Sequence, residues 1–85
     1  MAIDLRLLYG LPIVCIDVVF SGRRLHLENV LLDTGSAGTI VDADKVAEIG
    51  AMDYGIEIDG ILGFDFIREA GLIIDANNMQ VYSTN

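Results

Sequence analysis

A run of apolar residues that ends abruptly in an acid is the feature that most constrains this chain. It reads Leu31-Leu32-Asp33-Thr34-Gly35-Ser36. An acid placed where a buried strand leaves the core is partly desolvated, which suits it for acid–base chemistry. Gly35 leaves room for a tight turn and for a substrate, while the hydroxyls of Thr34 and Ser36 can orient the carboxylate. Asp, Gly and Ser are also ordinary turn residues, so a working acid and a plain chain reversal are both open at this point.

A second motif, of a different kind, lies downstream. It reads Asp59-Gly60-Ile61-Leu62-Gly63-Phe64-Asp65-Phe66-Ile67. The first stretch resembles the active-site signature of aspartic proteases, a family in which an apolar-apolar-Gly strand passes beside the aspartate loop and leads into a short helix. With both motifs in the right order, the chain resembles a bacterial retropepsin-like protease. The resemblance implies a mostly β fold, a small closed β-barrel of the acid-protease type with one or two short helices, in a single domain of residues 1–85.

Size and charge restrict the partners. The chain has 85 residues, enough for one domain, and 53% of them are hydrophobic, which is more apolar material than one small core readily hides. We therefore expect self-association. With 13 acidic against 5 basic residues the formal net charge is −8, so nucleic acids and anionic membrane surfaces should be repelled. The sequence shows neither a signal peptide nor an apolar stretch long enough to span a bilayer, and we expect a cytoplasmic protein.

Period-two alternation and β-branched residues predict strands, and turn residues punctuate them. The predicted strands cover residues 3–8, 13–20, 24–28, 29–32, 39–41, 72–75 and 79–82, with turns at 9–12, 21–23 and 76–78. His26 falls on the polar face of its strand and, without a neighbouring cluster of ligands, is interpreted as a surface residue rather than a general base or metal ligand. Cys15 is the only cysteine, which excludes an internal disulfide and a cysteine-built metal site, and we interpret it as a core residue.

Two short helices are predicted, and each is followed by a glycine. The first runs over residues 42–49, with an aspartate as its cap. The second covers residues 63–70, with Phe64 and Ile67 directed inward and Phe66 as a further candidate.

The chain departs from the family between its two motifs. Retropepsin-like proteases carry a long β-hairpin, the flap, before the Ile-Leu-Gly strand, but here only residues 51–60 separate Gly50 from Ile61. The flap itself is therefore expected to be missing, which weakens substrate clamping and the exclusion of water. The acids of this region, Asp53, Glu57 and Asp59, suggest a cation site, but their spacing does not follow a calcium loop. We therefore interpret them as solvated acids.

Hydrolysis of this type needs two carboxylates that share one proton, and the chain holds a single Asp-Thr-Gly. A two-fold homodimer supplies the second, so Asp33 and its symmetry mate are expected to form the catalytic dyad, with the strands at 3–8 or 79–82 in the interface. By resemblance, Thr34 ties the two loops together, Gly35 contacts the substrate backbone and Ser36 hydrogen-bonds Asp33. The substrate-adjacent strand is Ile61, Leu62 and Gly63, and no metal or cofactor is expected.

Three interpretations follow from the sequence. The first is a homodimeric aspartic endopeptidase that acts on peptides or proteins. The second is a catalytically weak or inactive relative, a dimerisation or peptide-binding module that keeps the loop as a structural turn because the flap is missing. The third is a shortened form of a longer protein. Binding of a pepstatin-like inhibitor separates the first two.

Overall fold

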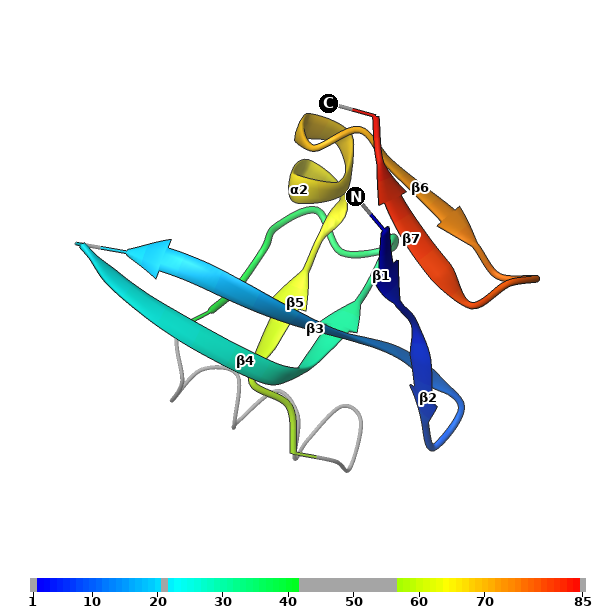
Figure 1. Cartoon of the computed structure of the whole chain (residues 1–85), viewed down its shortest axis with the longest axis horizontal. Coiled ribbons are helices and arrows are strands. Elements are labelled where there is room, and N and C mark those ends of the chain that lie inside the picture. The colour runs from blue at the N-terminus through cyan, green and yellow to red at the C-terminus, as the bar shows by residue number, and fades with distance from the viewer. Residues whose placement is uncertain (1, 21, 42–56, 85) are drawn as a thin grey trace.

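The computed structural model describes residues 2–20, 22–41 and 57–84. In this part the chain is mostly β, as predicted, and carries one short helix (Figure 1). The elements are β1 (Ala2–Asp4), β2 (Arg6–Leu8), β3 (Leu11–Phe20), β4 (Arg23–Leu32), β5 (Gly60–Leu62), α2 (Phe64–Glu69), β6 (Leu72–Asp75) and β7 (Gln80–Ser83). The helix predicted over residues 42–49 and most of the segment after it lie outside the described residues.

The described strands form two sheets, one of order β1-β7-β6 and one of order β2-β3-β4-β5. Neighbouring strands are antiparallel except for β4 and β5, which run parallel. The strand predicted over residues 3–8 is split at Leu5, whose N–H donates to the Met79 carbonyl oxygen at 2.9 Å, so one stretch of chain serves both sheets. These strands show no closed barrel, and the acid-protease barrel stays a prediction.

The first hairpin is tighter than predicted. Leu8 pairs with Leu11, so the turn consists of Tyr9 and Gly10 alone, and the predicted turn at 9–12 is corrected to these two residues. Both have positive φ, 53° and 80°. Two such residues form the turn that matches the twist of the flanking strands, which explains why β3 begins two residues earlier than predicted.

The long β3–β4 hairpin contains a break in register. Val14 pairs with Val30, but Ile16 pairs with Leu27, so two residues of β4 lie opposite Cys15 alone. Such a β-bulge bends the strand and redirects the side chains next to it. The bulge lies between the core end of the hairpin and its free end, which extends away from the rest of the molecule (Figure 1).

The core lies on both faces of the β2-β3-β4-β5 sheet. Val30 and Leu32 face a cluster between this sheet, α2 and the other sheet, while Leu31 faces a smaller cluster on the opposite side. The first cluster consists of Leu5, Val14, Leu27, Val30, Leu32, Leu62, Ile67 and Val81, and the second of Ile13, Leu31, Ile58 and Ile61. Burial on both faces is why the end of β4 is a continuous apolar run rather than an alternating one.

Helix α2 lies within the predicted range 63–70 and is one residue shorter at each end, but its orientation differs. Ile67 is buried, whereas Phe64 and Phe66 are exposed, so the prediction of an inward Phe64 was wrong. A helix of six residues presents little more than one side chain to the core, and the backbone N–H of Phe64 is already held by the loop at Ser36. Gly71 follows with φ of 60°, as expected for a helix end. Among the described residues, no helix has the length and apolar character needed to cross a membrane.

Candidate functional site

The predicted aspartate loop lies at the edge of the sheet where β4 and β5 both end. Asp33 follows β4 directly, and its N–H donates to the carbonyl oxygen of Leu62, the last residue of β5, at 2.9 Å. Because the two strands are parallel, the loop after β4 and the Gly63 segment after β5 leave the sheet side by side. The structure therefore brings together the two motifs that the sequence singled out.

Hydrogen bonds within the loop fix the carboxylate. The Gly35 N–H donates to Asp33 Oδ1 at 3.0 Å, and the Ser36 N–H donates to the Asp33 carbonyl oxygen at 3.2 Å. The Ser36 hydroxyl donates to the Gly38 carbonyl oxygen at 3.1 Å, and the expected bond from this hydroxyl to Asp33 stays a prediction. Thr34 and Gly35 are exposed, and Asp33 is half-buried. The carboxylate is thus oriented by backbone and still open to solvent.

Gly63 packs against the loop more closely than any other residue type allows. A Cβ atom at this position would lie 2.6 Å from the Gly38 carbonyl oxygen and 2.8 Å from the Ser36 carbonyl oxygen. The next residue, Phe64, donates its N–H to that Ser36 oxygen at 2.6 Å. The backbone after β5 therefore serves as a support on which the aspartate loop rests.

A second link between the two segments was not predicted from the sequence. The Thr39 hydroxyl donates to Asp65 Oδ1 at 2.7 Å and accepts the Gly63 N–H at 3.0 Å, while the Thr39 N–H donates to Asp65 Oδ2 at 3.2 Å. The two bonds that Thr39 donates to Asp65, the one from its hydroxyl foremost, lower the pKa of the Asp65 carboxyl. The two residues are 26 positions apart, and only a hydroxyl after the loop and an acid in the first turn of the helix hint at the contact.

The strand expected at residues 39–41 is reduced to a single bridge. Ile40 pairs with Ile61 through two hydrogen bonds, of 2.9 and 2.8 Å. Strand β5 thus lies between β4 on one side and Ile40 on the other. Of the predicted substrate-adjacent residues, Ile61, Leu62 and Gly63 are all buried, so they act here as the support of the loop.

An apolar groove of about 720 Å³ opens beside this support. Its walls are β3 and β4 side chains near the hairpin's free end, together with Thr39, Val41, Leu62 and Phe66. Asp33 is not among the described residues that line the groove. The groove therefore adjoins the loop's support rather than the carboxylate itself.

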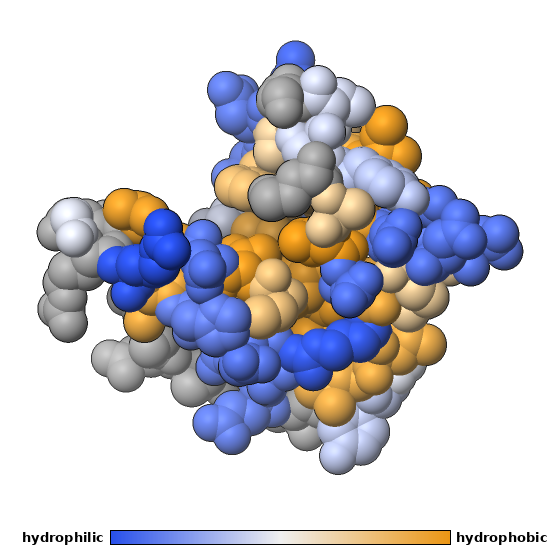
Figure 2. Space-filling view, viewed as in Figure 1, coloured by the Kyte–Doolittle hydropathy of each residue, from blue (hydrophilic) through white to orange (hydrophobic). Residues whose placement is uncertain are grey.

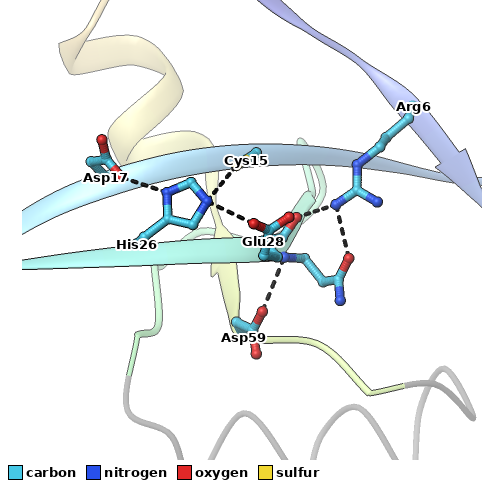
Figure 3. Close-up of polar contacts among 7 residues, drawn as sticks. Arg6, Cys15, Asp17, His26, Glu28 and Asp59 are labelled. Atoms are coloured by element: carbon cyan, nitrogen blue, oxygen red, sulfur yellow. Dashed lines mark hydrogen bonds and ion pairs between the residues drawn. The ribbon is translucent and has the colours of Figure 1, made fainter.

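A polar cluster on the outer face of the β3–β4 hairpin corrects two sequence interpretations (Figure 3). His26 lies 3.2 Å from Cys15 through Nε2 and Sγ, 2.6 Å from Asp17 through Nδ1 and Oδ1, and 2.8 Å from Glu28 through Nε2 and Oε1. The hydrogen bond to Asp17 and, after it, that to Glu28 raise the pKa of His26. His26 is exposed as predicted, but the statement that it lacks neighbouring ligands was wrong, and Cys15 is half-buried rather than a core residue.

The bulge explains both corrections. The residues share one face because they alternate along paired strands, with Cys15 and Asp17 on β3, His26 and Glu28 on β4, and Asp17 paired with His26. The alternation could be predicted from the sequence, but the register that places Cys15 beside Glu28 of β4 could not. In the space-filling view, hydrophilic side chains gather over β3 and β4 in the middle of the face (Figure 2).

The acids considered for a cation site do not act together in the described residues. Asp59 accepts the N–H of Asn29 at 3.0 Å and donates its own N–H to the Asn29 carbonyl oxygen at 2.7 Å, so it ties the start of β5 to β4. Glu57 is exposed. Asp53 lies outside the described residues.

Comparisons with known protein families, with curated proteins and with solved structures find no match to this chain.

Proposed function

We propose that this chain is an aspartic endopeptidase of the retropepsin type, active as a homodimer in which each Asp33 supplies one carboxylate of the dyad. The close contact of Gly63 with the aspartate loop carries the proposal. A plain turn needs no such support, because a turn residue can face solvent without a second strand held against it. The support here involves both motifs and leaves Asp33 oriented and half-buried at the sheet edge.

The chemistry follows from two carboxylates held face to face. Like charges at that separation cannot both persist, so the pair shares one proton. The ionised member removes a proton from a water molecule, which attacks the scissile carbonyl carbon, while the protonated member donates to the carbonyl oxygen. In each subunit the Gly35 N–H donates to one carboxylate oxygen of Asp33 and so fixes the orientation of the group.

The same proposal includes the acid-protease type of fold and the dimer. The position of β5 between β4 and Ile40 supports the proposed fold type, because β4 precedes the aspartate loop and Ile40 follows it, so β5 pairs with the chain on both sides of the loop. The dimer is supported by exposed apolar side chains on the edge strands, among them Leu7 on β2 and both Ile73 and Ile74 on β6. Of the two expected interface strands, β7 already has neighbours on both sides and β1 has one, so an added strand would pair with β1 or β6.

The position of the apolar groove favours a second candidate, a weak or inactive module that binds peptides. The groove is built by β3, β4 and the support of the loop, so an extended apolar peptide could lie in it without approaching Asp33. A loop that has lost its clamp would then keep only a structural role. This candidate predicts peptide binding that is insensitive to substitution of Asp33.

Cleavage of a mixed peptide library across pH, with the Asp33→Asn variant beside the natural chain, tests the proposal. We expect weak cleavage, strongest at acidic pH, where one of the two carboxylates still holds its proton, and its loss in Asp33→Asn. Weak activity is expected because a dyad without a flap keeps its acid and base but loses the closure that positions the bond and excludes water. Glu69→Gln is the control, because it also removes one negative charge but lies at the end of α2, outside the aspartate loop and the strands expected to pair between copies.

Cleavage that persists unchanged in Asp33→Asn would show that another group is catalytic. If neither chain cleaves, binding of a pepstatin-like inhibitor decides between the candidates. Inhibitor binding by the natural chain that fails in Asp33→Asn supports a dyad. Peptide binding that is equal in both supports the module.

A further inference from the structure

The polar cluster on the β3–β4 hairpin takes no part in the proposed protease chemistry. Sγ of Cys15, Nε2 of His26 and a carboxylate oxygen of Glu28 all lie within 4.8 Å of one another. Two of these separations, 2.8 Å to Glu28 and 3.2 Å to Cys15, involve His26 Nε2. A sulfur, a nitrogen and an oxygen donor from three side chains therefore converge on one small volume (Figure 3).

We propose that Cys15, His26 and Glu28 bind a Zn²⁺ ion and that Asp17 positions His26 for it. Zinc takes thiolate, imidazole and carboxylate ligands in a tetrahedral arrangement, at bond lengths that place the donor atoms about 3.4–3.6 Å apart. The separations of His26 Nε2 from Glu28 Oε1 and Cys15 Sγ, 2.8 and 3.2 Å, are shorter than this. These donor atoms therefore need to part by less than about 1 Å to admit the ion. Binding releases the proton of the thiol and any proton held at Nε2.

Asp17 occupies the place of the outer carboxylate that metal-binding histidines use. His26 Nδ1 lies 2.6 Å from Asp17 Oδ1, so the ring donates its Nδ1–H to Asp17, and Nε2 is directed toward Cys15 and Glu28. The carboxylates of Asp17 and Glu28 lie 2.6 and 2.8 Å from the two ring nitrogens, and their negative charge favours a cation at this point of the surface. Asp17 is thus a positioning residue rather than a ligand.

The backbone holds the donors in place before any metal arrives. Asp17 and His26 are paired across the two strands, and the bulge brings Glu28 beside Cys15. The Arg6 guanidinium reinforces the bulge, because it donates to the Glu28 carbonyl oxygen and, at 2.8 Å, to Asn29 Oδ1. A site carried by strands and fixed by such outer contacts loses little freedom when it binds an ion.

The donor set selects among metals. Calcium and magnesium prefer oxygen ligands alone, whereas a thiolate beside an imidazole favours zinc and its neighbours in the first transition row. The side chains of His26 and Glu28 are 53% and 67% exposed, so the fourth tetrahedral position faces solvent and would hold a water molecule. Three protein ligands and one open position are the pattern of zinc sites that react or exchange ligands rather than of closed structural ones.

Titration of the reduced chain with Co²⁺, followed by competition with Zn²⁺, tests the site. Cobalt replaces zinc in tetrahedral sites and reports a bound thiolate by a sulfur-to-metal charge-transfer band and a tetrahedral geometry by its visible d–d bands. We expect one Co²⁺ per chain with both signals, and their loss when one equivalent of Zn²⁺ is added. Circular dichroism of every variant establishes that it folds, which is expected because the substituted side chains lie on the outer face.

The variants separate the proposed roles. Cys15→Ser should abolish the charge-transfer band, and His26→Gln should abolish the visible bands. Asp17→Asn should weaken Co²⁺ binding by about 10- to 100-fold while leaving both signals in shape, because the ligands remain. Asp75→Asn is the matched control: it removes the same charge, and asparagine keeps a turn-forming side chain, so its affinity should equal that of the natural chain.

Two results would overturn the proposal. One is a natural chain that shows no charge-transfer band at millimolar Co²⁺. The other is an affinity that falls equally in Asp17→Asn and Asp75→Asn, which would mean that the ion senses only the overall charge of −8. Either result leaves the protease proposal standing, because Asp33 lies five residues beyond Glu28 on the chain, about 16 Å along an extended strand.

Discussion

At the scale of single residues, Gly63 is the position where one added carbon has the largest expected effect. The atoms that a Cβ would meet belong to the backbone of Ser36 and Gly38, at 2.6 to 2.8 Å, and backbone cannot rotate away. We expect Gly63→Ala to lower the free energy of unfolding by roughly 1–3 kcal/mol, as overpacking of a tight contact does, and to displace the aspartate loop. Urea unfolding measures the loss.

The chain offers a matched control for this substitution on the other side of the same contact. A Cβ at Gly38 would meet nothing within 4 Å, and its φ is not in the left-handed region. Gly38→Ala should therefore be neutral or stabilise the protein by about 0.4–1 kcal/mol through the unfolded state. Equal losses in Gly38→Ala and Gly63→Ala would contradict the close contact.

The Asp65 carboxylate gives the support of the loop a pH dependence. Bonds from the Thr39 hydroxyl and then from the Thr39 N–H lower the pKa of Asp65 from its ordinary value of 3.8. A lowered pKa in the folded state means that the carboxylate stabilises the fold above pH 3.8, and that this contribution is lost as the pH falls through the folded-state pKa. We expect Asp65→Asn to be less stable than the natural chain near neutral pH.

Unfolding curves of both proteins at a series of pH values check this expectation. The difference in unfolding free energy between them should be greatest above about pH 5 and should narrow as the solution is acidified below the ordinary pKa. Thr39→Val, which removes the main hydrogen-bond donor, should also lose unfolding free energy relative to the natural chain, and this loss should narrow in acid. Asp4→Asn, a substitution at an exposed residue of β1, should show no such pH-dependent loss. A difference that stays constant with pH would show that the carboxylate charge is not involved.

At the scale of elements, the sequence predicted what depends on neighbouring residues. The end of β4, the helix after Gly63 and the turn before β7 were all predicted. Their signals are an apolar run, a glycine at a helix end and asparagines in a turn, and each of these depends on only a few neighbouring residues. The break at Leu5 was not predicted. Residues 3–8 form one stretch rich in leucine and isoleucine. The N–H of Leu5, which donates to the carbonyl oxygen of Met79 far along the chain, marks where this stretch divides between two sheets.

The same limit applies to the two candidate sites. Asp33 and Gly63 were found because each stands in a local motif. The contact of Thr39 with Asp65 and the cluster around His26 depend on which residues lie opposite each other, and a shift of one position in the β3–β4 register would move Cys15 to the other face. A bulge is a property of the paired strands, and neither strand's sequence specifies it alone.

At the scale of the whole molecule, an apolar edge strand connects the composition with the expected dimer. Strand β6 is an edge of the β1-β7-β6 sheet, and its two central residues, Ile73 and Ile74, are both exposed although they point to opposite faces. An edge strand with apolar side chains on both faces and no charge at its centre is a template for pairing with another chain. We therefore expect β6 to lie in the contact between two copies.

The substitution Ile73→Lys tests this contact, because a charge at the centre of an apolar edge opposes the approach of a second chain. We expect the dimer dissociation constant, measured by sedimentation velocity at micromolar concentrations, to rise by about tenfold or more, equivalent to about 1.4 kcal/mol. Leu25→Lys is the matched control, because Leu25 is 54% exposed against 53% for Ile73 but lies on β4 of the other sheet. An equal rise in both variants would place the contact between the two copies elsewhere. A natural chain that sediments only as a monomer would leave Asp33 without its symmetry mate and would end the proposal of a dyad.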